Sequence, residues 1–315
     1  MKISIVIPNY NGEKLLAKNF PKVLSAILNY KDGEVEIIII DDGSTDNSVS
    51  SIKYYVSSVK DKKIKFKILE NKTNLGFSST VNNGVKEAKG DILVLLNTDV
   101  VPEKDFLQPL IEHFNDESVF AVGCMDKSIE GSKIVLRGRG IGKFDKGFLV
   151  HKRGEVNKRN TLWVSGGSSA FRKSIWDKLG GFNELYNPFY WEDIDLSYRA
   201  LKAGYRILFE LKSIVVHEHE EGAISKKFSS FKIKTISYRN QFIFVWINIT
   251  DLDLQFSHLI WLGYNMLKAL LRIDFPFFLG FTEAFILLPK IIKSTFKVQK
   301  LFIKKDKDIL KEFTE

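Results

Sequence analysis

The stretch "EIIIIDDGSTDNS", residues 36–48, decides the fold class of this chain. Four consecutive isoleucines with no alternating polar position indicate a strand that is buried on both faces, as in a parallel sheet covered by helices. The strand runs directly into Asp41 and Asp42, followed by a glycine and turn-forming residues. Because open α/β sheets bind ligands at the carboxyl ends of their strands, we expect the two aspartates to lie beside a ligand.

Three further runs share this pattern, at residues 3–8, 65–70 and 91–97. The segments between them have the length of helices, and those at 13–30 and 74–90 carry an apolar stripe or helix start and stop signals. Strands that alternate with helices predict an α/β fold with a parallel sheet. With 315 residues, 44% of them hydrophobic, the chain can bury a large core, which favours one large domain or a domain with an appendage.

Several features exclude particular classes of protein. Cys124 is the single cysteine, so neither an internal disulfide nor a zinc site of several thiolates can form, and a reducing compartment fits best. The first residues, "MKISIVIPNYNGEK", reach a Pro-Asn turn too soon for a signal peptide and predict a first strand. The glycines of "RGRGIGKF", residues 137–144, miss the dinucleotide-binding spacing, so we expect a hairpin or loop there.

Polar side chains follow each predicted strand, in the groups Pro8-Asn9-Tyr10-Asn11, Asp41-Asp42-Gly43-Ser44, Glu70-Asn71 and Asn97-Thr98-Asp99. A carboxylate such as Asp99 can help to hold Mg²⁺ or Mn²⁺ when substrate phosphates and water complete the shell, which suits a nucleotide diphosphate. Two plainer interpretations stay open. Ser44 or Asp46 starts a helix after a turn, and Asp99 caps a helix that begins near Pro102.

Beyond residue 100, the chain is predicted to contain a helix over 101–114, a strand over 121–126, a helix from Arg172 to Gly180 and a strand over 213–217. The strand delivers His217 at its carboxyl end. This histidine could ligate a divalent metal, orient a phosphate or only pack, and the same alternatives hold with less support for His219. Gly166 and Gly167 allow the backbone to approach a ligand or another strand closely.

The acidic segment "WEDID", residues 191–195, opens a predicted helix that ends near Gly204. Its carboxylates, Glu192, Asp193 and Asp195, either complement the helix dipole or serve in catalysis. The aromatic residues before them, in "NPFYW", favour the second alternative, because an apolar setting raises a carboxylate pKa toward that of a general base.

The basic charge is concentrated in residues 226–315, which hold 15 Lys/Arg, 8 Asp/Glu and 17 of the 40 aromatic residues. The uncharged run at 254–267 is too short to span a bilayer. Over 288–304, the sequence predicts one amphipathic helix suited to an anionic membrane interface, with Lys290, Lys293, Lys297, Lys300 and Lys304 on one face and Leu288, Ile292, Phe296, Phe302 and Ile303 opposite. A helix packed on the catalytic domain and a homodimer contact stay open. Nucleic acid is not expected, since no binding motif accompanies the charge.

Six segments, among them "VIPNYNGEKLL", "IIIIDDGSTDNS", "LLNTDVVP" and "YWEDIDLSYRALKAGYRI", occur in the order found in the family 2 inverting glycosyltransferases, which this sequence resembles over about residues 1–225. The resemblance is closest to the rhamnosyltransferase-like and galactofuranosyltransferase-like branch of bacterial cell-surface polysaccharide synthesis. It implies a GT-A fold, a Rossmann-like nucleotide-diphospho-sugar transferase domain at 1–225, and a basic, aromatic and helical C-terminal extension at 226–315.

The resemblance also implies a donor site. Tyr10 corresponds to the residue that stacks on the nucleotide base, with Pro8 and Asn11 shaping its loop, while Asp42 contacts the base or ribose and Asp41 is structural. Asp99 is the last acid of the metal-binding "DXD" element, whose first position is Asn97 here. The implied cofactor is Mg²⁺ or Mn²⁺, and the implied donor is a UDP-, dTDP- or GDP-linked sugar.

For catalysis, the resemblance assigns the base to Asp193 and a metal ligand to His217, with support from Glu192, Trp191, Gly166 and Gly167. We therefore expect a hexosyltransferase that uses a saccharide or lipid-linked saccharide acceptor. The expected location is cytoplasmic, peripheral on the inner face of the plasma membrane. The rival hypothesis is a non-catalytic nucleotide-sugar-binding assembly partner, and the intact "WEDID" element counts against it.

Overall fold

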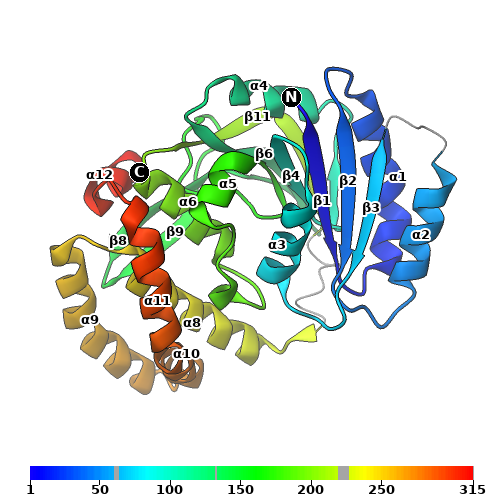
Figure 1. Cartoon of the computed structure of the whole chain (residues 1–315). Coiled ribbons are helices and arrows are strands. Elements are labelled where there is room, and N and C mark those ends of the chain that lie inside the picture. The colour runs from blue at the N-terminus through cyan, green and yellow to red at the C-terminus, as the bar shows by residue number, and fades with distance from the viewer. Residues whose placement is uncertain (60–63, 132, 219–226, 315) are drawn as a thin grey trace.

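A computed structural model describes residues 1–59, 64–131, 133–218 and 227–314. Its centre is a mixed sheet with the strand order β3-β2-β1-β4-β10-β6-β11-β5 (Figure 1). The first four strands in sequence, β1 (Ile3–Asn9), β2 (Val35–Asp41), β3 (Lys65–Glu70) and β4 (Ile92–Leu96), run parallel to one another. The four strands predicted from apolar runs are therefore confirmed to within a residue or two at each end.

The four isoleucines of β2 show why this sequence forms a sheet covered on both faces. Ile37 and Ile39 pack in the core formed with α1 (Glu13–Asn29) and α2 (Ser48–Ser58). Ile38 and Ile40 point to the other face, into the core that contains α3 (Phe77–Glu87). Since successive side chains of a strand point to opposite faces, an unbroken apolar run fits only a strand whose two faces are both covered by other elements.

The remaining strands extend this sheet beyond β4. β10 (Ser168–Arg172) lies antiparallel between β4 and β6 (Val119–Glu130), and β11 (Arg206–Glu218) runs parallel to β6. β7 (Lys133–Arg137) pairs with β6, and β8 (Gly140–Asp145) with β9 (Phe148–Arg153) form a separate two-stranded sheet. The glycine-rich residues 137–144 therefore belong to strand ends and hairpins, as predicted.

The helix predicted over 101–114 is only partly correct. Residues Val100–Pro102 form β5, whose partner is the end of β11, and the helix α4 (Leu107–Glu112) begins later and continues into the 3-10 turn η1 (His113–Asn115). The correction has a tertiary cause. Val100 and Val101 pair with His217 and Val216, and this long-range pairing outweighs the local helical pattern.

Three helical elements lie between β10 and β11. α5 (Lys173–Leu179) ends at Gly180, which has the left-handed φ of 85° expected of a glycine at a helix C-terminus. The 3-10 turn η2 (Glu184–Tyr186) follows, and α6 (Glu192–Lys202) begins with the acidic segment. The predicted helices from Arg172 and from "WEDID" are therefore confirmed.

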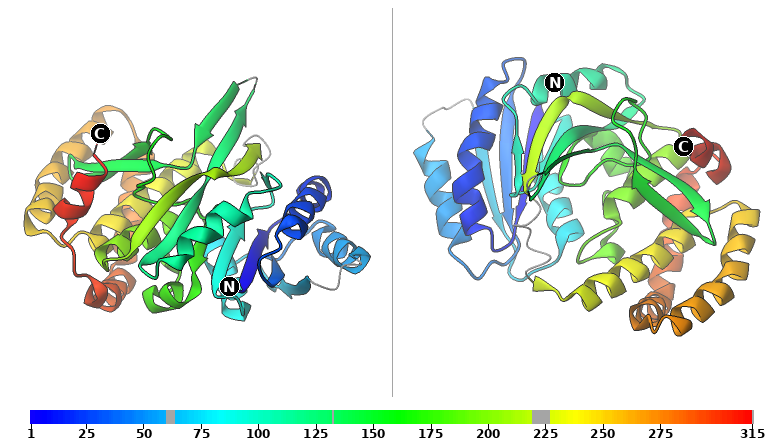
Figure 2. Two further views of the ribbon diagram at one scale, coloured as in Figure 1. Left: turned by 90° about the horizontal axis from the view of Figure 1, so that it is seen from above. Right: turned by 180° about the vertical axis from the view of Figure 1, so that it is seen from behind.

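The C-terminal residues form the helices α8 (Ser230–Asn248), α9 (Leu252–Leu271), α10 (Phe275–Ile286), α11 (Leu288–Val298) and α12 (Asp306–Glu312), with a 3-10 turn η4 (Gln299–Leu301). α9, α10 and α11 lie at the end of the molecule away from α1 and α2 (Figure 2). Buried side chains of α8 and α10, such as Phe242 and Phe277, share one hydrophobic core with Phe171 of β10.

The single amphipathic helix predicted over 288–304 is interrupted. The backbone amides of Ile303 and Lys304 both donate to the carbonyl of Lys202 on α6, at 2.8 and 3.0 Å. This tie ends the helical segment, so Phe302, Ile303 and Lys304 lie outside α11 and η4. In the described part of the chain, no single helix is long and apolar enough to cross a bilayer. α10 and residues Leu288–Leu301 have the required length and apolarity only when taken together, and the two segments are bent by 66° relative to each other.

Candidate active site

The loops that follow β1 and β2 are joined by Asp41. Its buried carboxylate accepts hydrogen bonds from Asn9 Nδ2 at 2.7 Å, and from the amide and hydroxyl of Ser44 at 2.9 and 2.6 Å. Oδ1 therefore has partners from both segments, Asn9 and Ser44, and Oδ2 accepts from the amide of Ser44. Asp41 holds the carboxyl ends of neighbouring strands in one arrangement.

Asn11 and Tyr10 form the tip of the first loop. Asn11 adopts a left-handed φ of 48°, and its Oδ1 accepts a hydrogen bond of 2.8 Å from the amide of Thr45. Pro8, three residues before Asn11, still belongs to β1 and lies beside Ile40 of β2. The ring of Tyr10 faces Lys227, whose Nζ lies 4.0 Å from the ring centroid, so a cation contacts the aromatic face.

Asp42 organises a different loop from Asp41. Its Oδ1 accepts from Asn71 Nδ2 and the amide of Leu75, each at 2.9 Å, and its Oδ2 accepts from the amide of Gly76 at 3.0 Å. These contacts fix the loop between β3 and α3. Gly76 has a φ of 87°, and a Cβ there would lie 2.9 Å from Asn187 side-chain atoms. Asp42 thus has a structural role in addition to the donor contact that the sequence predicts.

The end of β4 carries two buried oxygens that lack a partner within the described residues, Oδ1 of Asn97 and Oδ1 of Asp99. The amide of Asn97 donates to the carbonyl of Gly167 at 2.9 Å. A Cβ at Gly167 would lie 2.3 Å from Asn97 Nδ2, so glycine is needed for the close approach. Buried oxygens without partners are costly unless a ligand or ion satisfies them.

His217 lies between two carboxylates. Its Nε2 is 3.3 Å from Asp99 Oδ2, and its Nδ1 is 3.3 Å from Asp126 Oδ2. Burial lowers the pKa of His217, but the hydrogen bonds and negative charges of Asp126 and Asp99 outweigh it and raise the pKa to about 9. Asp126 was not among the site residues predicted from the sequence, although it follows an apolar run in "AVGCMD" just as the other polar site residues follow theirs.

The donor set at this edge fits a hard divalent cation. Asp99 and Asp126 offer carboxylate oxygens, and Asp99 Oδ1 is free of other partners among the described residues. His217 would offer an imidazole nitrogen only after a bound cation had displaced a proton from the ring. No three Asp, Glu, His or Cys side chains within the described ranges already converge on one point that could hold a metal. Phosphate oxygens and water would therefore have to complete the coordination shell.

Asp193 lies in the first turn of α6, next to the glycine pair. Its Oδ2 accepts from the amide of Gly166 at 3.2 Å, and its Oδ1 accepts from the amide of Ile194 at 2.8 Å. Burial raises the pKa of Asp193, and the backbone N–H donors offset part of that shift. A carboxylate with a raised pKa that is still hydrogen-bonded is suited to accept a proton.

Glu192 differs from its neighbour. Its side chain is buried, and Oε2 has no hydrogen-bond partner in the described part of the chain. Burial, and then the nearby charge of Asp193, raise the pKa of Glu192 well above the usual range. Burial therefore shifts both carboxyl groups toward their neutral forms, and at Glu192 the neighbouring charge of Asp193 adds to that effect.

Trp191 is a core residue. Its buried ring lies edge-on to His151 at 5.0 Å and tilted against Phe244 at 5.2 Å. Its backbone, like that of Tyr190, has a positive φ, 75° and 69° respectively. The ring therefore packs in the core beside the start of α6, and is not part of the cluster of polar groups at the strand ends.

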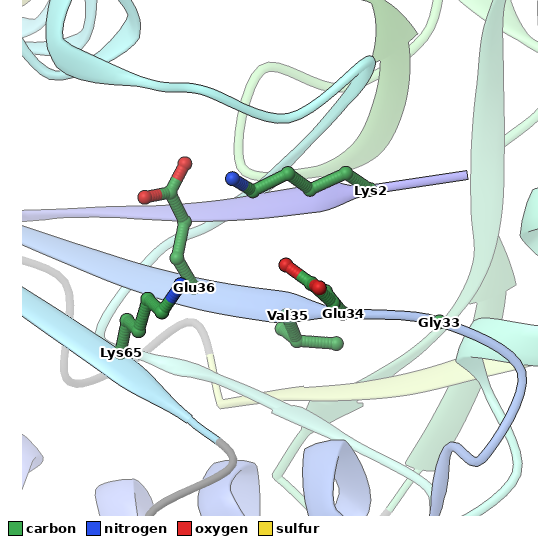
Figure 3. Close-up of a pocket in the computed structure, with 6 residues that line it drawn as sticks. All are labelled: Lys2, Gly33, Glu34, Val35, Glu36 and Lys65. Atoms are coloured by element: carbon green, nitrogen blue, oxygen red, sulfur yellow. The ribbon is translucent and has the colours of Figure 1, made fainter.

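Direct contacts join several of the predicted residues in pairs. Gly166 is hydrogen-bonded to Asp193, and Gly167 to Asn97. Asn97 lies two residues before Asp99, which in turn contacts His217. His219 lies outside the described residues. A shallow hollow lined by Lys2, Gly33, Glu34, Val35, Glu36 and Lys65 lies at the amino ends of β1, β2 and β3, away from these residues (Figure 3).

The polar groups lie at the carboxyl ends of the parallel strands, where open α/β sheets bind their ligands. Residues 4–180 match the model of "Glycosyl transferase family 2", and the chain belongs to that family. It is 28% identical over 224 residues to the O-antigen chain rhamnosyltransferase RfbN of Salmonella typhimurium, an alignment that covers 70% of this chain and 67% of that protein.

Two solved structures share the fold. GalNAc-T7, with UDP, GalNAc and Mn²⁺, superposes with a TM-score of 0.61 at 19% identity over 78% of this chain and 48% of that chain. The mannosyltransferase PcManGT of Pyrobaculum calidifontis, with GDP-Man and Mn²⁺, superposes with a TM-score of 0.54 at 15% identity, over 95% of this chain and 84% of that chain. At these identities the comparison establishes the fold, and the predicted GT-A fold is confirmed.

Proposed function

We propose that this protein is an inverting hexosyltransferase that moves a sugar from a nucleotide-diphosphate donor to a saccharide hydroxyl in cell-surface polysaccharide synthesis. The observation that carries the proposal is the position of Asp193, hydrogen-bonded to Gly166 beside the Gly167–Asn97 contact at the ends of the strands. The similarity to an O-antigen chain rhamnosyltransferase supports the type of pathway. The UDP and GDP-Man in the two superposed structures support the class of donor.

In the proposed mechanism, Asp193 is the general base. It accepts the proton of the acceptor hydroxyl as that oxygen bonds to the anomeric carbon, while the bond from the anomeric carbon to the diphosphate breaks. One displacement of this kind inverts the anomeric centre. Base catalysis by a positioned carboxylate contributes on the order of 10²- to 10⁴-fold.

On the donor side, we assign the nucleotide base to the ring of Tyr10, with Asn11 and Pro8 supporting its loop and Asp42 contacting the base or ribose. Lys227, beside Tyr10, supplies a positive charge that favours an anionic diphosphate. Asp99, His217 and Asp126 would hold Mg²⁺ or Mn²⁺ together with diphosphate oxygens. Bound there, the cation would neutralise negative charge on the leaving group.

The base assignment is tested by Asp193→Asn, which keeps the size of the side chain but cannot accept the proton. We expect transfer to be lost while calorimetric affinity for the donor nucleotide is kept. Asp177→Asn is the matched control, because Asp177 is exposed on α5 and pairs only with Lys173 among the described residues. Turnover retained by Asp193→Asn would refute the assignment. For the metal site, we expect Asp99→Ala to abolish the gain in nucleotide affinity that Mn²⁺ provides.

We further propose that α9, α10 and α11 lie on an anionic membrane surface, where a lipid-linked acceptor would be found. Apolar side chains along α9 are more than half exposed, namely Leu252, Phe256, Leu259, Ile260, Leu267, Leu270 and Leu271. On α11, Ile292 and Phe296 are exposed beside Lys293 and Lys297. Exposed apolar surface of this extent is typical of an interaction site, and the lysines complement anionic lipid headgroups.

Charge on these helices supports a lipid surface over a second copy of the chain. The two acidic residues of α9, α10 and α11, Asp253 and Glu283, are paired with Lys307 and Lys232. The net field of the face is therefore positive, so two copies brought face to face would repel each other.

Vesicle sedimentation tests the membrane proposal. We expect the protein to bind phosphatidylglycerol vesicles more strongly than phosphatidylcholine vesicles, and Ile260→Asp to abolish binding. Tyr54→Asp is the control, since Tyr54 is equally exposed but lies on α2. A homodimer in the absence of lipid, broken by Ile260→Asp and without vesicle binding, would contradict the proposal and assign the face to a second copy.

A further inference from the structure

Two adjacent residues of α8 bind the backbone of the loop that leads into the acidic segment. Asn240 is fully buried, and its Nδ2 lies 3.0, 2.9 and 2.9 Å from the carbonyls of Tyr186, Phe189 and Tyr190. Its two N–H groups are thus shared among three acceptors. Arg239 Nη2 donates to the carbonyl of Asn187 at 2.5 Å. One turn of α8 therefore holds most of residues 186–190.

The carbonyls that Asn240 binds belong to a loop in an unfavourable conformation. Tyr190 and Trp191 both have left-handed φ values, which non-glycine residues rarely adopt. Such a conformation persists only where the surrounding structure imposes it. The carbonyl of Trp191 then accepts the first helical hydrogen bond of α6, from the amide of Asp195 at 2.8 Å. The loop conformation therefore sets the start of the helix turn that carries Asp193.

The same loop also contacts the donor side of the site. The amide of Phe77 donates to the carbonyl of Pro188 at 3.1 Å, and Asn187 Oδ1 accepts from the amide of Ser78 at 3.0 Å. These contacts place the loop against the N-terminus of α3, directly after Gly76, which Asp42 binds. The loop is thus held between α3 on one side and α8 on the other.

We propose that Arg239 and Asn240 are positioning residues that orient Asp193 by holding the loop at 186–190. The inference rests on the proposed role of Asp193 as the base. Both residues lie in the C-terminal extension, outside the residues 4–180 that match the family model. The C-terminal extension accordingly contributes to the orientation of the base, in addition to any contact with a membrane.

Arg239 offers the cleaner test, because it is partly accessible whereas Asn240 is fully enclosed. Arg239→Met removes the donor to Asn187 and keeps much of the apolar stem, while Arg239→Lys keeps the charge but loses the planar guanidinium. Asn240→Asp keeps the shape and replaces the N–H donors by an oxygen facing the three carbonyls. Gln241→Ala is the matched control on the same helix, since Gln241 contacts the carbonyl of Leu149 on β9.

The assay uses the full chain with Mn²⁺ and whichever of UDP-glucose, dTDP-rhamnose and GDP-mannose the wild type turns over. We expect kcat to fall on the order of 10²-fold in Arg239→Met, as for a displaced catalytic group. Arg239→Lys should retain more activity. Calorimetry with the matching nucleoside diphosphate should still give wild-type affinity and one site per chain, whereas a variant that merely misfolds would show a reduced number of sites.

The outcomes separate this inference from the proposed function. If Asp193→Asn is inactive while Arg239→Met and a folded Asn240→Asp keep the wild-type kcat, the positioning role is wrong and the base assignment stands. If Asp193→Asn retains turnover, the base assignment itself fails. A loss of kcat in Gln241→Ala equal to that in Arg239→Met would show general loosening of α8 and would also overturn the positioning role.

Discussion

The carboxylate of Asp306 on α12 is predicted to be a main tie between the C-terminal residues and the catalytic sheet. Asp306 and Lys202 of α6 are both fully buried, and Lys202 Nζ lies 2.9 Å from Asp306 Oδ1. Oδ1 also accepts from the hydroxyl of Tyr198 at 2.8 Å. Oδ2 accepts from the amides of Thr250 and Asp251 at 2.7 and 2.8 Å.

The change we propose is Asp306→Ala, which removes the carboxylate that pairs with the Lys202 ammonium and accepts from two backbone amides, and leaves Lys202 Nζ with Thr250 Oγ1 at 2.6 Å. Removing one member of a buried ion pair costs about 3–5 kcal/mol in the free energy of unfolding. The entropy of unfolding is about 2.1 cal/mol/K per residue, so in a chain of this length each kcal/mol lowers Tm by about 1.5 °C. The expected decrease in Tm is therefore about 5–8 °C.

Differential scanning calorimetry measures this shift directly. The double variant Lys202→Met with Asp306→Asn removes both charges and keeps an oxygen for the backbone amides, so it should be more stable than the single variant Asp306→Asn. Asp308→Ala is the control, because Asp308 lies on the exposed side of α12. A decrease in Tm below about 2 °C for Asp306→Ala, or a double variant no more stable than Asp306→Asn, would refute the reasoning.

Three further predictions concern the site. Burial raises the pKa of Asp193, and a base acts in its deprotonated form, so kcat should fall as the pH drops through that raised pKa; a profile that stays flat down to the ordinary aspartate range would contradict this. Tyr10→Ala should weaken calorimetric nucleotide affinity by about 1–3 kcal/mol, the value of one stacked base, whereas Tyr10→Phe should not. Gly167→Ala should displace Asn97 and reduce the gain in affinity from Mn²⁺ without altering the circular dichroism spectrum, and an unchanged gain would show that Asn97 tolerates the shift.

The sequence alone determined the parallel half of the sheet and its binding edge. The apolar runs that became β1, β2, β3 and β4 need cover on both faces, and that requirement is visible in the order of residues. Parallel strands bring their carboxyl ends to one edge, so Asn97, Asp99 and the residues after β1 and β2 could be predicted to lie near one another. The helix that carries Asp193 was equally visible from its acidic first turn and terminal glycine.

Only the tertiary structure decided which distant groups meet. Asp126 joins His217 because β6 and β11 are parallel neighbours, although 91 residues separate the two side chains. Val100–Pro102 forms a strand because it pairs with β11. The helical segment that begins at α11 ends early because the carbonyl of Lys202 accepts hydrogen bonds from the amides of Ile303 and Lys304. Local propensity cannot predict such pairings, because they depend on loop closure and on packing of the whole chain. The hydrogen bonds from Asn240 to the loop before Asp193 also could not be predicted from local sequence, since each polar group meets its partner only when the surrounding core has formed.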